Sequence, residues 1–461
     1  MMRRPIIHPA FPVRCKLSGF SLIELMVAIT IGLLILIATT TLFINVSDGN
    51  RSISKTNRQI ENGRLAIQLL ASDVAHAGFW GSYAPQFDDL TLDTALTPTD
   101  VPTAVPDPCL AYNASNWTVA YKNNLIGIPV QAYDVTAPVM QGTSCSSLVV
   151  SPKVNTDILV TRHAETCVPG SGGNCDANTI GKLYFQSPLC AAEVGANAQS
   201  GGSLLTLNMA ATASSTVDAY RGITVRIVSG TGAAQSRVIL AYDGGSKIAT
   251  VTPAWITVPD STSIYSLDYQ FDTSGLNLHK KDCSTVTETR KYISNLYYIR
   301  DYATTAGDGI PTLMRSQFDL SGVSLSHQPA VPLINGIDGF KVELGIDNVS
   351  KTGAAVDYTQ PINWGDPLTQ TQATNRGDGS VDGSFVHCSS AAQCSAAQLE
   401  NVVVVKLYVL ARTEETVSGY KDTKTYVLGS STLGPFNDGY QRHVFETTVR
   451  LVNISGRRET P

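Results

Sequence analysis

The chain carries one long uncharged apolar run close to its N-terminus. The run extends from Leu25 to Ile44, twenty residues without a charged side chain. Twenty helical residues span about 30 Å, the thickness of the hydrocarbon core of a bilayer. Basic residues precede the run, and no acidic residue accompanies them: Arg3, Arg4, Arg14 and Lys16. The pattern predicts one transmembrane helix at about residues 22–44, with residues 1–19 in the cytoplasm.

Beyond the apolar run, the helical pattern continues, but with apolar residues along only one narrow face of the helix. Apolar residues recur every seven positions between polar ones: Val46, Ile53, Ile60, Ile67 and Val74. This spacing predicts an amphipathic helix over residues 45–78, so the whole N-terminal helix covers about 20–80. We expect the stripe to pack on the chain's own globular domain, and an autonomous coiled coil is the alternative. Gly63 costs roughly 1 kcal/mol inside the helix, and Gly78, Gly81 and Pro85 end it.

Residues 81–461 are expected to form a β-rich globular head. Apolar and polar residues alternate with a period of two in three segments, 340–347, 403–409 and 445–451, which is typical of half-buried antiparallel strands. The fold class predicted is therefore α+β, with a long helix packed on an antiparallel head. Residues 85–110, rich in proline, predict an extended surface loop, and residues 203–268 an inserted β-module that faces outward.

Composition narrows the class of protein. Hydrophobic residues make up 43% and charged residues 15%, which excludes a disordered polar chain and a multi-span membrane protein. The formal net charge of −5 offers no basic surplus, so no nucleic acid is expected as a partner.

A plain membrane anchor would not explain the carboxylate of Glu24 next to the apolar run. A carboxylate inside a bilayer costs about 3 kcal/mol, so it is normally retained for a partner. A cleaved secretory signal fits less well, because the run is long and ends in Thr39-Thr40-Thr41-Leu42-Phe43-Ile44 without small residues of the A-x-A kind.

The segment around Glu24 resembles a known processing signal. Gly19-Phe20-Ser21-Leu22-Ile23-Glu24-Leu25 is similar to the class III signal of type IV pilins and type II secretion pseudopilins. The resemblance implies that a prepilin peptidase cuts between Gly19 and Phe20 and that Phe20 becomes N-methylated. In a filament core, Glu24 would then neutralise a Phe20 ammonium, so that neither charge is left unpaired.

Scattered segments resemble one minor-pilin family, the type IV pilus assembly protein W (PilW) family. They are Glu61 to Ala66, Ala77 to Gly81, Asp157 to Arg162, Tyr297 to Ile299, Leu313 to Arg315 and Arg442 to Leu451. The resemblance implies a structural subunit that takes part in pilus assembly or initiation. Its partners would be the prepilin peptidase, other major and minor pilins and the inner membrane. The head would lie in the periplasm and then on the pilus. The alternatives are a minor pseudopilin of a type II secretion system and a pilus-tip adhesin that uses residues 203–268 or the proline-rich loop.

The cysteines indicate an oxidising compartment. Removing Cys15 with the leader leaves eight of the nine, an even set that suggests disulfides. Eight cysteines allow 105 connectivities. Close spacing favours Cys167–Cys175 and Cys388–Cys394; Cys190–Cys283 would bracket the inserted module, and Cys109–Cys145 would remain.

Metal and enzyme chemistry find no support in the sequence. No C-x-x-C pair exists and the seven histidines form no ligand-spaced cluster, so no metal is expected. The chain lacks a G-x-S-x-G elbow, an H-E-x-x-H motif and a Walker loop. We expect no catalytic residues and no cofactor.

Overall fold

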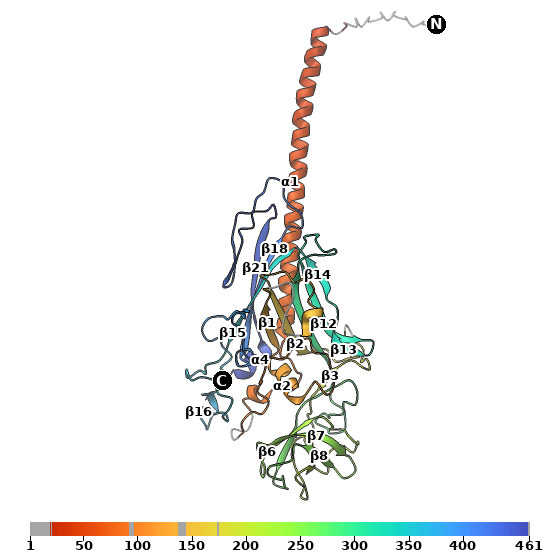
Figure 1. The fold of residues 1–461 in the computed structure, drawn as a ribbon, viewed down its shortest axis with the longest axis vertical. Coiled ribbons are helices and arrows are strands. Elements are labelled where there is room, and N and C mark those ends of the chain that lie inside the picture. Colours follow the sequence, from red (N-terminus) through yellow and green to blue (C-terminus); the bar gives the residue numbers. More distant parts are fainter. Residues whose placement is uncertain (1–18, 20, 92–95, 137–143, 173–174, 460–461) are drawn as a thin grey trace, which may run out of the picture. The chain divides into compact units, whose positions relative to one another are not determined.

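The computed structural model describes residues 19, 21–91, 96–136, 144–172 and 175–459. It divides into two compact units, Met1–Asn57 and Arg58–Pro461. The helix α1, Leu22–His76, begins in the first unit and ends in the second (Figure 1). Its N-terminal part is apolar and long enough to cross a membrane, and the side chains there are exposed, Leu34 by 68%. Because strands dominate the second unit, the predicted α+β class is confirmed.

In the second unit, α1 packs on the strands by a different stripe from the predicted one. Ile67 and Val74 are buried as expected, but Ile60 is 38% exposed. The buried face of α1 is Gln59, Gly63, Ala66, Ile67, Leu70 and Val74. The strict seven-residue stripe is therefore wrong at Ile60. The helix turns Gln59 and Gly63 inward instead because both meet the strands of the head. The helix ends before Gly78, which has a φ of +75°.

A three-stranded antiparallel sheet, with strand order β15-β18-β21, forms one part of the head. The strands are β15 (Ile337–Ile346), β18 (Val402–Arg412) and β21 (Arg442–Arg450). All of β15 is buried, including Lys341 and Glu343, so the prediction of a half-buried strand is wrong there. Lys341 is buried because it forms an ion pair: its Nζ lies 2.8 Å from Asp157 Oδ1. Glu343 is buried because its Oε1 accepts a hydrogen bond from the Ser430 amide, in a turn, at 2.6 Å.

The larger sheet has eight strands in the order β1-β2-β11-β12-β13, with β14 paired to β12 and β3 joining β10 to β11. Its strands are β1 (Val130–Asp134), β2 (Asp157–Ala164), β3 (Tyr184–Gln186), β10 (Gln270–Asp272), β11 (Arg290–Arg300), β12 (Thr312–Ser321), β13 (Ser324–His327) and β14 (Val331–Asn335). Leu159 on β2 and Tyr297 on β11 share one hydrophobic core with Leu70 of α1 and Phe340 of β15. The two sheets and the helix therefore form one packed body.

A separate six-stranded antiparallel sheet contains the residues predicted as an inserted module. Its order is β4-β9-β6-β7-β8-β5, and in Figure 1 strands β6, β7 and β8 lie below β3. The strands are β4 (Val194–Asn197), β5 (Thr206–Asn208), β6 (Thr224–Ser229), β7 (Ser236–Asp243), β8 (Ile248–Thr252) and β9 (Ile264–Leu267). The sheet thus begins at Val194, before the expected boundary at 203. It has its own core, which includes Tyr220, Tyr242 and Trp255. We call residues 194–267 the inserted module.

Short elements complete the head. They are the helices η1 (Gln86–Asp88), α2 (Val119–Gly127), η2 (Ser144–Ser147), α3 (Ala396–Leu399) and α4 (Val452–Arg458), and the hairpins β16 (Trp364–Asp366) with β17 (Thr371–Ala373) and β19 (Tyr426–Leu428) with β20 (Ser431–Leu433).

The proline-rich segment 85–110 is not the extended surface loop that its sequence predicts. Phe87 is 2% and Asp100 4% exposed. Asp100 accepts a hydrogen bond from the Gln86 amide at 2.7 Å. A Cβ built on Gly127 of α2 would lie 2.5 Å from Pro102. The described parts of the segment, 85–91 and 96–110, lie against the head because their hydrophobic side chains pack there, a tertiary effect that proline content does not reveal.

Candidate functional site: the N-terminal motif and the helix it begins

The residues around the predicted cleavage position form the start of α1. Gly19 is exposed, and Phe20 lies outside the described residues. The Ser21 amide donates to Glu24 Oε2 at 3.0 Å, and Ser21 Oγ accepts from the Ile23 amide at 3.3 Å. The S-x-x-E spacing is that of a capping box, and its glutamate half is present: Glu24 satisfies the Ser21 amide, which the helix leaves without a partner. Glu24 therefore has a local role that was not predicted, although the S-x-x-E spacing is visible in the sequence.

The capping contact also bears on the assembly role expected of Glu24. Glu24 is exposed on a helix whose neighbouring side chains are apolar, and its carboxylate lies beside the positive end of the helix dipole. Its cap partner, the Ser21 amide, lies at this end of α1. A carboxylate that already accepts one backbone amide retains lone pairs for a second donor.

Asp73 attaches the second part of α1 to the larger sheet. Its Oδ2 accepts from Thr161 Oγ1 on β2, and its Oδ1 accepts from Asn295 Nδ2 on β11 at 3.0 Å. His163 Nε2 lies 3.4 Å from the same Oδ1. Burial opposes ionisation, but the hydrogen bond and charge of His163, with those of Thr161 and Asn295, lower the pKa of Asp73. The sequence gives no sign of this role, because the partners of Asp73 are distant along the chain.

The same helix meets the three-stranded sheet about three to four turns earlier, at Gly63 and Gln59. Gln59 Nε2 donates to the Ala411 carbonyl on β18 at 2.9 Å. Phe445 of β21 lies over Gly63, where a Cβ would come within 2.1 Å of its ring. Gly63 thus leaves the space that the Phe445 ring occupies, a reason for glycine that the sequence did not supply.

One cluster in the head has the residue types of a metal site. Asp134, Asp157 and His387 bring ligand atoms within 4.8 Å of one another. Lys341 Nζ lies 3.3 Å from Asp134 Oδ1 and 2.8 Å from Asp157 Oδ1. The hydrogen bond with Asp157, at 2.9 Å, outweighs burial and raises the pKa of His387. Because an ammonium already compensates the two carboxylates, a divalent ion would have to displace it; we assign the cluster to ion pairing between β2 and β15.

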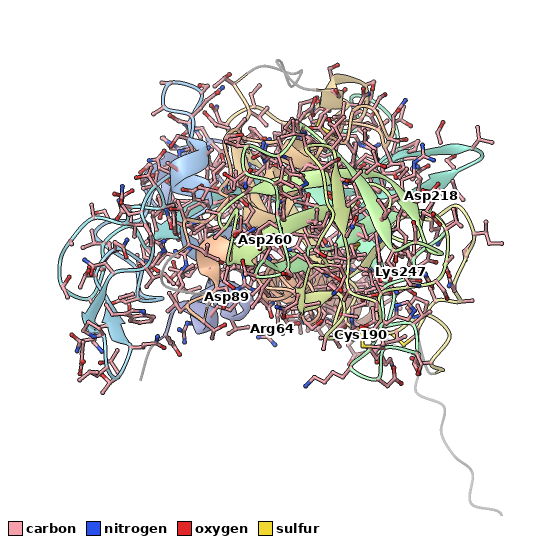
Figure 2. The ribbon with its side chains drawn as sticks, turned by 90° about the horizontal axis from the view of Figure 1, so that it is seen from below. Arg64, Asp89, Cys190, Asp218, Lys247 and Asp260 are labelled. Carbon is pink, nitrogen blue, oxygen red and sulfur yellow. A yellow bond between two sulfur atoms is a disulfide. The ribbon has the colours of Figure 1, made fainter. Side chains whose placement is uncertain are left out.

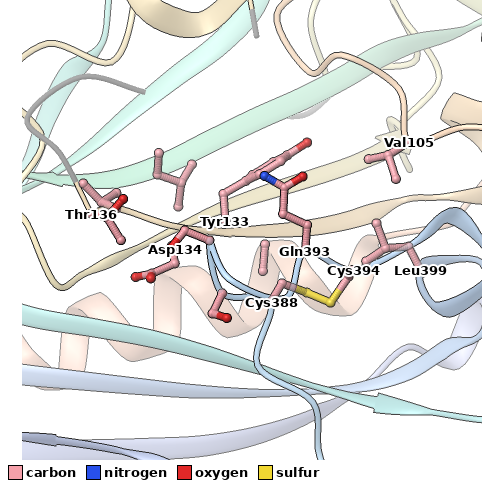
Figure 3. A pocket seen from close by; sticks show the side chains of 13 residues that line it. Val105, Tyr133, Asp134, Thr136, Cys388, Gln393, Cys394 and Leu399 are labelled. Carbon is pink, nitrogen blue, oxygen red and sulfur yellow. A yellow bond between two sulfur atoms is a disulfide. The ribbon is translucent and has the colours of Figure 1, made fainter. Parts of the chain in front are cut away.

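A cavity of about 340 Å³ lies beside this cluster. Figure 3 shows it between β1 and the loop closed by Cys388–Cys394. Its lining includes Tyr133, Asp134 and Gln393. Apolar and polar side chains both line the cavity, and the described residues around it hold no nucleophile paired with a general base.

The structure contains four disulfides: Cys109–Cys145, Cys167–Cys175, Cys190–Cys283 and Cys388–Cys394. They are the same pairs that spacing and elimination suggested. Cys190 and Cys283 lie on either side of the inserted module in sequence, so their bond closes the module at its base. Cys15 lies outside the described residues.

Two family models match the chain. Residues 15–40 match the prokaryotic N-terminal methylation motif, and residues 296–453 match Type IV Pilus-assembly protein W. The second match begins in β11 and ends in α4, so the inserted module lies outside it. No curated protein and no solved structure matches the chain.

A methylation motif at the start of an apolar helix, followed by a β-rich head with disulfides, defines a pilin-type protein. The motif implies processing by a prepilin peptidase, and the apolar helix fits a membrane-anchored pilin. Over residues 296–453, from β11 to α4, the chain is similar to the type IV pilus-assembly protein W family, and the two matches together support a type IV pilus-related pilin. Both matched families are structural rather than enzymatic.

Proposed function

We propose that the chain is a minor pilin that takes part in type IV pilus assembly or initiation as a structural subunit. A prepilin peptidase cleaves it between Gly19 and Phe20, and Phe20 is then methylated. The observation that carries the proposal is Glu24, a carboxylate in the apolar part of α1 and inside the matched methylation motif. In an apolar helix bundle, Glu24 pairs with the amine of Phe20, its own or that of a neighbouring pilin.

The proposed topology follows from charge and redox chemistry. Residues 1–19, with their basic side chains, stay in the cytoplasm. The head crosses to the periplasm before assembly and lies on the pilus afterwards. Four disulfides in the head support this direction, because disulfides persist in oxidising compartments.

Mass spectrometry of the N-terminus tests processing. Wild-type protein should begin with N-methylated Phe20, whereas Gly19→Leu should retain the leader. A processed, normal-sized Gly19→Leu product would contradict the assignment of the cleavage site. The matched control is Gly49→Leu, since Gly49 lies farther along the same helix and a Cβ there would meet nothing within 4 Å.

Glu24→Gln separates insertion from assembly. The amide preserves the shape of the side chain but removes the charge that would pair with the Phe20 amine. We expect membrane insertion and cleavage to remain and incorporation into pili to fall. Glu61→Gln, at an exposed carboxylate on α1, should leave incorporation unchanged. Equal incorporation of Glu24→Gln and wild type would refute the proposed role of this charge.

The alternatives differ in phenotype. Loss of secretion with intact pili in a deletion strain would favour a type II secretion pseudopilin. A tip adhesin would need the inserted module, whose two ends lie together: the Leu267 amide donates to the Glu193 carbonyl at 2.7 Å, so a short linker joins the cut ends. Excision of 194–267 should spare piliation and abolish surface attachment if the module is adhesive.

A further inference from the structure

A second cavity lies where the inserted module meets the larger sheet. Its volume is about 320 Å³. Three segments distant in sequence line it: one leads into α2 and contains Tyr112 and Trp117, one is the module turn at Asp218, and one is the return strand β10 with Phe271. Asp218 is labelled in Figure 2. The module thus supplies one wall of a cavity that the rest of the head would leave open.

Aromatic rings form the inner wall of this cavity. The centroids of Tyr112 and Trp117 are 5.2 Å apart, and those of Trp117 and Phe271 are 6.0 Å apart, both in edge-to-face arrangements. Trp117 is 4% and Phe271 5% exposed, so the wall is fixed by the core behind it. Tyr112 is half-buried. A rigid aromatic wall offers apolar contact area at little entropic cost.

Lys122 supplies a cation without a direct ion pair among the described residues, although the carboxylate of Asp272 also lines the cavity. It lies on α2 and lines the cavity, and no described carboxylate comes within ion-pair distance of its ammonium. Burial lowers the pKa of Lys122, and the negative charge of Asp272 opposes the change. Asp272 Oδ1 is instead held by the Thr273 amide at 2.6 Å. A bound carboxylate would offset the free-energy cost of burying the Lys122 ammonium.

Polar groups at the mouth can serve a polyhydroxylated ligand. Burial, with the charge of Asp272, raises the pKa of Tyr112 to about 12, so its hydroxyl stays neutral and can donate. Arg221 and Asp218, 3.7 Å apart, are exposed at the module side. The volume lies at the lower end of the roughly 300–1,000 Å³ that small-molecule sites occupy, which suits one or two sugar rings.

We propose that this cavity binds an acidic sugar unit, with its ring against Tyr112 and its carboxylate paired with Lys122. A neutral sugar would leave Lys122 without a directly paired carboxylate. A simple carboxylate would leave the aromatic wall uncovered. The acidic sugar is either a free monosaccharide or a residue of a polysaccharide, since both present the same ring and carboxylate.

Titration of the full chain in detergent micelles tests the proposal, with glucuronate, glucose and acetate as probes and calorimetry as readout. Glucuronate should bind at least about tenfold more tightly than glucose or acetate, the factor expected for one charge-assisted hydrogen bond. Lys122→Gln should weaken glucuronate binding by a similar factor. Lys351→Gln, an exposed lysine outside this cavity, makes the same charge change and should have no effect. Thermal unfolding of each variant checks that the fold is intact.

Three results would overturn the proposal: no binding of glucuronate, equal affinity for acetate, or unchanged binding by Lys122→Gln. An oligouronide distinguishes the two sources of ligand. Tighter binding than the monosaccharide assigns the cavity to a polysaccharide, and equal binding assigns it to a free sugar. The assay needs no pilus, so its outcome is independent of the proposed assembly function.

Discussion

Gly63→Ala is expected to destabilise the head, although helix propensity alone predicts the opposite. Alanine is favoured over glycine by about 1 kcal/mol inside a helix. Gly63, however, lies under the ring of Phe445. The added Cβ would sit 2.1 Å from Cε2, 2.4 Å from Cδ2 and 2.8 Å from Cζ of that ring.

The two opposing effects can be compared in size. Three ring atoms closer than 3.0 Å require the ring to move, and such overpacking typically costs about 1–3 kcal/mol. Subtracting the propensity gain leaves a net loss of about 0–2 kcal/mol. Phe445 is half-buried on β21 and packs against the His443 ring with centroids 4.8 Å apart, so its movement disturbs that contact too.

A double-mutant cycle measures the packing cost directly. Urea unfolding of the full chain in micelles, followed by tryptophan fluorescence, gives the free energy of unfolding. In the Phe445→Ala background, Gly63→Ala should stabilise by about 1 kcal/mol, because only helix propensity remains. The change of sign between backgrounds is the decisive result. Stabilisation by Gly63→Ala in the wild-type background would refute the packing argument. Gly49→Ala, which meets nothing within 4 Å, is the control.

Two further predictions concern buried acid and cross-links. Burial raises the pKa of Asp100 to about 7, so between about pH 4 and 7 the folded state holds a proton that the unfolded state releases, and this carboxyl lowers the free energy of unfolding as pH rises through that range. Asp100→Asn should remove that part of the pH dependence in unfolding titrations. Identical pH profiles for the variant and the wild type would refute this role of Asp100. Replacing Cys190 and Cys283 by serine should cost about 2 kcal/mol more in unfolding free energy than replacing Cys167 and Cys175, because chain entropy grows with the 93-residue separation compared with 8; equal losses would contradict this account.

Local patterns predicted the elements whose causes are local. The apolar run and the glycine at 78 located α1, and alternation located β15, β18 and β21. The errors arise where burial depends on distant partners. Lys341 looked like a solvent-facing residue, but it pairs with Asp157, 184 positions away.

In the candidate site too, features with local causes were predictable and features with distant partners were not. The G-F-x-x-x-E motif is contiguous, so the sequence contained the resemblance to pilin processing signals. The cavity beside Lys122 was not predictable, because its walls come from three separate segments, 112–122, 218–222 and 270–275, that only the folded module brings together. Gly63 stands out in the sequence as a costly helix residue, but its reason, Phe445, lies at the far end of the chain.

The helix α1 contacts one sheet at Gly63 and the other at Asp73. The coupling energy between substitutions at these two positions therefore tests whether α1 holds the two sheets together. Gly63 contacts β21 of the three-stranded sheet, whereas Asp73 accepts hydrogen bonds from β2 and β11 of the larger one. Ten helical residues separate them by about 15 Å. At that distance, the losses from Gly63→Ala and Asp73→Asn should add within about 0.5 kcal/mol, provided that the two sheets are held together by their own contacts. Those contacts exist, since Lys341 of β15 pairs with Asp157 of β2. A coupling energy above about 1 kcal/mol in the unfolding assay would show instead that α1 itself holds the two sheets in register.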